Sequence, residues 1–68
     1  MIERDVTTIV QSVIADRGLP FVVLSVARVP AGWEVRAQRG GGVVSIVIPD
    51  GRPIDVRAAT EEQLEDAL

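Results

Sequence analysis

The stretch that decides the fold is "FVVLSVARVPAGWEVRAQRGGGVVSIVI", residues Phe21–Ile48. Three segments with strand patterns lie in it, and the turn-forming sequences "PAG" and "GGG" separate them. Phe21–Val29 and Val43–Ile48 are rich in β-branched residues, and Trp33–Arg39 alternates apolar and polar residues. β-Branched apolar side chains favour strands, whereas proline and glycine favour tight turns. Because short turns place consecutive strands side by side, the stretch predicts a three-stranded antiparallel meander.

A helical pattern precedes the strands and has a well-marked end. Apolar residues recur at spacings of three and four from Ile2 to Ile14, which is typical of one buried helix face. Arg17 then falls in the last turn, Gly18 suits the left-handed cap conformation, and Pro20 stops the helix. The sequence therefore predicts a helix that ends close to Arg17.

Two interpretations stay open for the residues after the third strand. The sequence "IPDGRP" predicts a turn, and residues 54–57 then form either a short fourth strand ("IDV") or the start of a second helix. Thr60 and Gln63 have the pattern of a capping box, which would start the helix at Thr60. A cap at Asp55 would instead place on one face Val56, Thr60, Leu64 and Ala67.

Taken together, these elements predict a single α+β domain over residues 1–68. Its order is helix, three-stranded antiparallel meander with a short fourth strand left open, then helix. Both helices most simply pack on one face of the sheet, which gives a two-layer fold. Which face they cover is not predicted.

The composition excludes most catalytic and metal chemistry. The chain has no Cys, His, Lys or Tyr, so the usual nucleophiles, general bases and zinc ligands are missing. None of the three serines, Ser12, Ser25 and Ser45, has an imidazole or amine side chain to activate it. We therefore expect a non-enzymatic protein without cofactor or metal.

Charge and hydropathy limit the partners. The net charge is −3, the sum of +1 from residues 1–57 and −4 from the last eleven residues. The four acidic residues of this end, Glu61, Glu62, Glu65 and Asp66, argue against nucleic-acid binding there. The longest apolar run, "LPFVVLSVA", is far shorter than the roughly 20 residues that span a bilayer. The start "MIERDV" has charges of both signs and lacks the pattern of a secretory signal. We expect a cytoplasmic protein with no membrane partner.

The first and third strands are apolar on both faces, whereas the middle strand has a polar row of Glu34, Arg36 and Gln38. If the helices cover one face, the other face is apolar on two of its three strands. Monomers rarely leave such a patch in water. We therefore predict a homodimer, or binding to another protein, through a candidate interface of Val23, Ser25, Ala27, Trp33, Val43, Ser45 and Val47.

The alternative hypothesis is an RNA- or anion-binding module. All seven basic residues are arginines. The candidate anion-binding residues are the arginines near the strand ends and the one within the middle strand, namely Arg28, Arg36, Arg39 and Arg52. Glu34 and Arg36 are two apart on one face, so we expect them to neutralise each other in part. Phosphate binding weakens steeply with salt, which would distinguish the two hypotheses.

The order helix, three strands, helix resembles the double-stranded RNA-binding domain over the whole chain. That family presents a cluster of lysines at the start of its second helix to contact phosphates. With a helix start at Thr60, the matching positions here are "TEEQ", Thr60–Gln63, which would repel phosphate. The resemblance therefore implies a topology and does not imply RNA binding.

Overall fold

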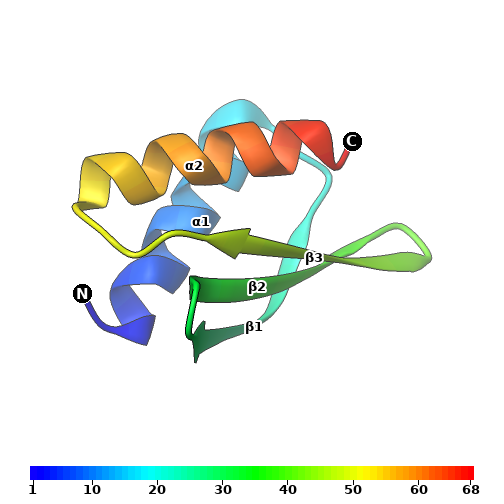
Figure 1. Cartoon of the computed structure of the whole chain (residues 1–68). Coiled ribbons are helices and arrows are strands. Elements are labelled where there is room, and N and C mark those ends of the chain that lie inside the picture. Colours follow the sequence, from blue (N-terminus) through cyan, green and yellow to red (C-terminus); the bar gives the residue numbers. More distant parts are fainter.

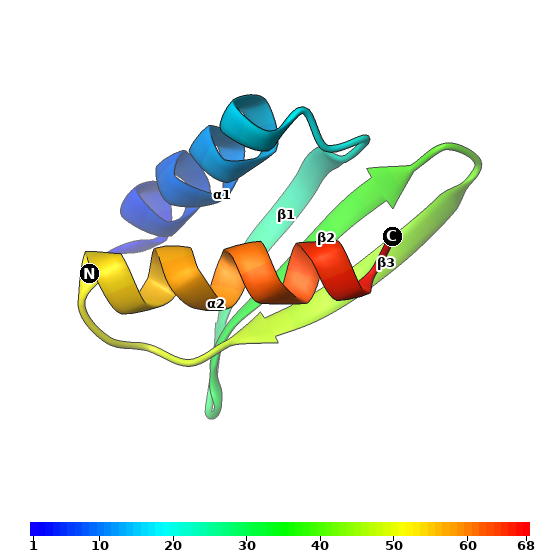
Figure 2. The same ribbon diagram turned by 90° about the horizontal axis from the view of Figure 1, so that it is seen from above.

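The computed structural model describes residues 1–68 and has five elements (Figure 1). They are, in chain order, α1 (Glu3–Arg17), β1 (Val22–Val29), β2 (Gly32–Arg39), β3 (Gly42–Ile48) and α2 (Pro53–Asp66). The strands form one antiparallel sheet in the order β1-β2-β3. Both helices lie on the same side of this sheet, with α1 against β1 and α2 against β3 (Figure 2). The predicted α+β meander with helices on one face is confirmed.

Helix α1 ends as the sequence predicts. Gly18 has φ 62° and ψ 39°, the left-handed conformation that glycine adopts without steric cost. The backbone N–H of Leu19 reaches back to the carbonyl oxygen of Ile14 at 3.0 Å. This bond satisfies one of the carbonyls that a helix end leaves free.

Helix α2 begins earlier than the capping-box pattern indicated. Arg52 is its N-terminal cap residue and Pro53 occupies the first turn, where the missing proline N–H has no helical partner to lose. Ile54–Val56 is therefore helical, and the fourth strand is absent. Thr60 lies two turns into the helix, fully buried, and its hydroxyl donates to the carbonyl oxygen of Val56 at 2.7 Å.

Two-residue turns fix the register of the sheet. Val29 pairs with Gly32 across Pro30–Ala31, and Arg39 pairs with Gly42 across the second turn. Gly32 has φ 137°, and a Cβ there would overlap the carbonyl oxygen of Ile48 and lie 2.8 Å from the backbone nitrogen of Asp50. Only glycine lets β2 start this close to the connection between β3 and α2.

A β-bulge in β1 changes which side chains share a face. Val23 pairs with Ala37 and Ser25 pairs with Arg36, so Leu24 is an extra residue without a partner on β2. Val23 is therefore on the helix-covered side, whereas Ser25 is on the opposite side. Strict alternation along the strand would have placed the two on one face.

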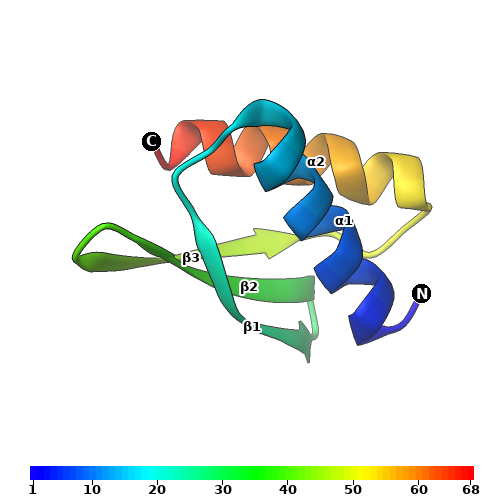
Figure 3. The same cartoon turned by 180° about the vertical axis from the view of Figure 1, so that it is seen from behind.

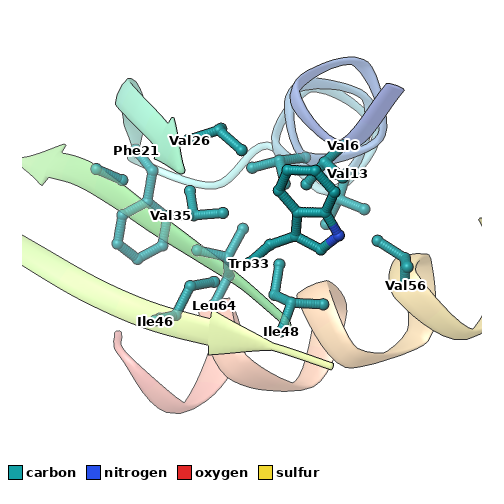
Figure 4. Packing of buried hydrophobic residues seen from close by; sticks show 12 residues of the cluster. Val6, Val13, Phe21, Val26, Trp33, Val35, Ile46, Ile48, Val56 and Leu64 are labelled. Carbon is teal, nitrogen blue, oxygen red and sulfur yellow. The ribbon is translucent and has the colours of Figure 1, made fainter. Parts of the chain in front are cut away.

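The core lies between the sheet and the two helices (Figure 4). Trp33 is only 3% exposed, and Val35 is fully buried beside it on β2. Around them pack Val6, Val10, Val13, Phe21, Val26, Ala37, Ile46, Ile48, Val56 and Leu64. Neither helix has the length and apolar content needed to cross a membrane.

Ion pairs connect the last turn of α1 to α2. Arg17 pairs with Glu61 at 3.0 Å and also with Glu65. Arg57 pairs with Asp16 at 2.7 Å and lies 3.9 Å from Glu61. The hydrogen bond to Glu61 raises the pKa of Arg17 above its ordinary value, so this guanidinium stays charged.

Candidate interaction surface

The side of the sheet that faces away from the helices, the open face, is uncovered by any other element (Figure 3). The pairing of the strands arranges its side chains in three cross-strand rows. These rows are Val22–Gln38–Val43, Ser25–Arg36–Ser45 and Ala27–Glu34–Val47. Each row therefore has a polar residue of β2 between smaller or apolar residues of β1 and β3.

Large apolar side chains are exposed on both outer strands. Val22 is 65% exposed and the bulged Leu24 is 51% exposed on β1, whereas Val43 is 54% and Val47 is 40% exposed on β3. The polar row predicted on β2 is confirmed, because Arg36 and Gln38 are exposed and Glu34 is half-exposed on this side. The open face thus has a polar centre, and its flanks are apolar apart from Ser25 and Ser45.

The charges at this centre have no partner within the chain. Four arginines, Arg17, Arg28, Arg52 and Arg57, form ion pairs. Arg36 forms none, and neither does Glu34. The two residues therefore do not form the ion pair that their spacing on β2 suggested. Ser25 and Ser45 flank Arg36, and their small side chains leave both of its sides accessible.

Five of the seven predicted interface residues lie on the open face, namely Ser25, Ala27, Val43, Ser45 and Val47. Trp33 belongs to the core, and Val23 is half-buried on the side of the helices. These two residues therefore do not contribute to the open face. Val22 lies on it, and the bulged Leu24 is exposed beside it. Strict alternation puts both on the face opposite Ser25 and Ala27, and nothing in the sequence marks the bulge.

The four arginines of the alternative hypothesis do not converge. Arg28 pairs in register with Trp33 near the first turn, whereas Arg39 pairs with Gly42 at the second turn, at the other end of the sheet. Two of the four are also engaged in ion pairs at one end of the molecule, Arg28 with Asp50 at 3.0 Å and Arg52 with Asp55 at 2.9 Å. The structure therefore gives them no common site.

The carboxylate of Asp50 accepts two hydrogen bonds and forms an ion pair. Its Oδ1 accepts hydrogen bonds from Trp33 Nε1 at 3.1 Å and from the backbone N–H of Gly51 at 3.0 Å. Its Oδ2 pairs with Arg28, whose guanidinium also lies 5.0 Å from the centre of the Trp33 ring. The indole hydrogen bond, more than the nearby Arg28, lowers the pKa of Asp50, and partial desolvation opposes both. These bonds fix the connection between β3 and α2.

One hollow of about 460 Å³ lies between the start of α1 and the start of α2. Its walls are Met1, Arg4, Asp5, Thr8, Ile9, Gly51 and Pro53. It is open to solvent, and no buried polar side chain without a hydrogen-bond partner points into it. No group of three or more carboxylates in the chain lies close enough together to hold a metal ion.

The chain matches no protein family, no curated protein and no solved structure. Its likeness to the double-stranded RNA-binding domain is one of element order. Since α2 begins at Pro53, the start of the second helix is Arg52–Arg57 and not Thr60–Gln63. Both arginines at this start are in ion pairs, Arg52 with Asp55 and Arg57 with Asp16.

Proposed function

We propose that this protein is a non-enzymatic interaction module that associates with a second copy of itself through the open face. The observation that carries the proposal is the exposure of three large apolar side chains, Val22, Val43 and Val47, on one uncovered face, with the exposed Leu24 at the bulge beside them. An antiparallel sheet can leave one face in water, but that face is then normally polar on every strand. Here β2 has a polar row, whereas β1 and β3 each add only one serine, Ser25 and Ser45.

The size of the chain supports the same proposal. A single core of fewer than roughly 70–80 residues rarely contributes more than about 3–5 kcal/mol of stability. Burying the open face against a second copy would add apolar contacts on the other side of the sheet. Each Å² of apolar surface removed from water contributes about 25 cal/mol.

The expected dimer is weak, because the face is small. Standard strand spacings give an open face about 14 Å wide and about 25 Å long. Taken as flat rectangles, two such faces bury about 700 Å². This is below the roughly 1,200 Å² of stable interfaces and in the range of weak, transient contacts. We therefore expect dissociation in the micromolar range.

Sedimentation equilibrium across a concentration series, from low micromolar to near millimolar, tests the proposal. The wild-type mass should rise from the 7.3 kDa of one chain towards twice that value. Val47→Lys should hold the protein at the monomer mass, because it places a long charged side chain where the second copy would pack on the open face.

Ile54→Lys is the matched control. Ile54 is 70% exposed, yet it lies on α2, on the helix side of the sheet. The Ile54→Lys variant should dimerise as the wild type does. Circular dichroism should show that both Ile54→Lys and Val47→Lys fold. A wild-type chain that stays at 7.3 kDa throughout, or a Val47→Lys variant that dimerises normally, would overturn the proposal.

A further inference from the structure

We infer that the dimer has a single register, fixed by two identical ion pairs in which Glu34 of each copy binds Arg36 of the other copy. In this arrangement a two-fold axis crosses β2 at the level of Val35. The inference rests on the proposed association through the open face. It adds the partner's orientation and the residues that select it.

The starting observation is that the open face contains two charges, of opposite sign, which the chain leaves unpaired. Glu34 and Arg36 are the charged members of the three cross-strand rows, and both lie on the central strand. They are separated along β2 by two residues, about 7 Å at standard strand rise. A surface with one positive and one negative charge side by side is complementary to its own copy.

Symmetry limits how two such faces can meet. Two identical sheets stack face to face only if the two-fold axis lies in the plane between them, and each contact is then repeated by symmetry. An axis along β2 would place Glu34 on Glu34 and Arg36 on Arg36 of the other copy. Both contacts would be between like charges and would cost several kcal/mol.

An axis across the strands gives the opposite result. If it passes at Val35, the two β2 strands run antiparallel, and Glu34 of one copy faces Arg36 of the other twice. A shift of the axis to Arg36 would bring the two guanidinium groups together. Of these three placements, only the axis at Val35 brings opposite charges together.

The neighbouring side chains fit this axis. It brings Ser25 of one copy over Ala27 of the other, and Ser45 over Val47, so a small serine faces each apolar neighbour of the ion pairs. Stacked sheets lie about 10 Å apart, a gap that an extended arginine and an extended glutamate span together. The bulky Val22 and Leu24 lie towards one end of β1, away from the axis.

The ion pairs act on register more than on affinity. Removing two charges from water costs about as much as their mutual attraction returns, so a central ion pair contributes little net affinity. A like-charge contact at the same place receives no such compensation. The valines therefore supply the affinity, and Glu34 and Arg36 exclude the other orientations.

Charge reversal tests the inference with three variants. Glu34→Arg alone and Arg36→Glu alone should each lose the homodimer, with affinity reduced by at least about tenfold, because both symmetric contacts become repulsive. An equimolar mixture of these two variants should associate again. One chain then has arginine at both positions and the other has glutamate at both, so both contacts are attractive. The double variant, Glu34→Arg with Arg36→Glu, should form a homodimer as well.

The matched control is Arg39→Glu, which makes the same charge change on the same strand but outside the three rows. It should dimerise like the wild type, and circular dichroism should confirm that every variant folds. If the wild type dimerises and the single variants do so equally well, the inference is wrong and the proposed function stands. A mixture that fails to restore association also overturns the inference. A wild type that is monomeric removes the proposed function itself.

Discussion

The indole nitrogen of Trp33 donates a hydrogen bond to Oδ1 of Asp50 across 3.1 Å, and this bond joins β2 to the segment that leads from β3 into α2. Arg28 adds an ion pair from β1 to the same carboxylate. Three parts of the sheet end are thus held by one side chain. The short connection Pro49–Gly51 is therefore held rigidly, which fixes the orientation of α2 relative to the sheet.

Acid should weaken this connection. The pKa of Asp50 is lowered below its ordinary value of 3.8, so the ionised carboxylate stabilises the folded state above that pH. This stability is lost as the pH falls from 3.8 through the lower pKa of the folded protein. Asp50→Asn keeps an acceptor for the indole and removes the charge. In urea unfolding followed by Trp33 fluorescence, the variant should be less stable at neutral pH, and the difference should shrink in acid. A difference that grows in acid would contradict the assignment.

Gly32→Ala should be among the most destabilising substitutions in the chain. The new methyl group would overlap the carbonyl oxygen of Ile48, and φ 137° is strained for any residue with a side chain. We expect a loss of more than about 2 kcal/mol in the free energy of unfolding. Gly41→Ala is the control, because nothing lies within 4 Å of its Cβ position. Equal effects of the two changes would mean that the close approach of β2 to Pro49–Asp50 is wrong.

The two faces of β2 should respond differently to truncation. Val35 is fully buried, so Val35→Ala should cost about 2 kcal/mol through lost contacts and a cavity. Arg36→Ala should change the unfolding free energy of the dilute, monomeric protein by no more than about 0.5 kcal/mol, as exposed positions usually do. Titration of the wild type, Arg36→Ala and Arg39→Ala with an RNA pool at low salt tests the alternative, an anion-binding role of β2. If folding stayed intact while wild-type binding was abolished, β2 would be an anion site.

Thr60→Val distinguishes a helix interior from a helix start. The carbonyl of Val56 is already the backbone acceptor for this turn of α2, so exchanging the buried hydroxyl for a methyl of similar size should cost less than about 0.5 kcal/mol. At a true N-cap the same change would cost about 1 kcal/mol or more. Thermal unfolding of the variant beside Thr60→Ala, which leaves a cavity, measures the difference.

Two sequence patterns predicted different starts for α2, and only one of them agrees with the structure. Thr60 and Gln63 matched a capping box, yet Val56, Thr60 and Leu64 recur every four residues, and all three are fully buried. The periodicity was the better guide, because burial of one face stabilises a helix more than a single cap does. The three strands and their turns followed from local composition alone, because proline and glycine marked both connections.

The faces of β1 could not be predicted in the same way. Alternation fails where one residue is inserted, and nothing local to "VVLSV" shows that Leu24 is the extra one. The bulge follows from how β1 is matched to β2 and packed under α1. The side assigned to Val23, and with it part of the interface, depended on contacts between distant segments.

The ion pairs between the helices have a consequence for how salt acts on this fold. All of them join Asp16 and Arg17, in the last turn of α1, to α2. The first turns of α1, by contrast, contact the rest of the molecule through apolar residues such as Val6. A kosmotropic salt such as sulfate screens the first kind of contact and strengthens the second. Added sulfate should therefore redistribute rigidity along α1, with amide exchange becoming faster at its C-terminal end and slower at its N-terminal end.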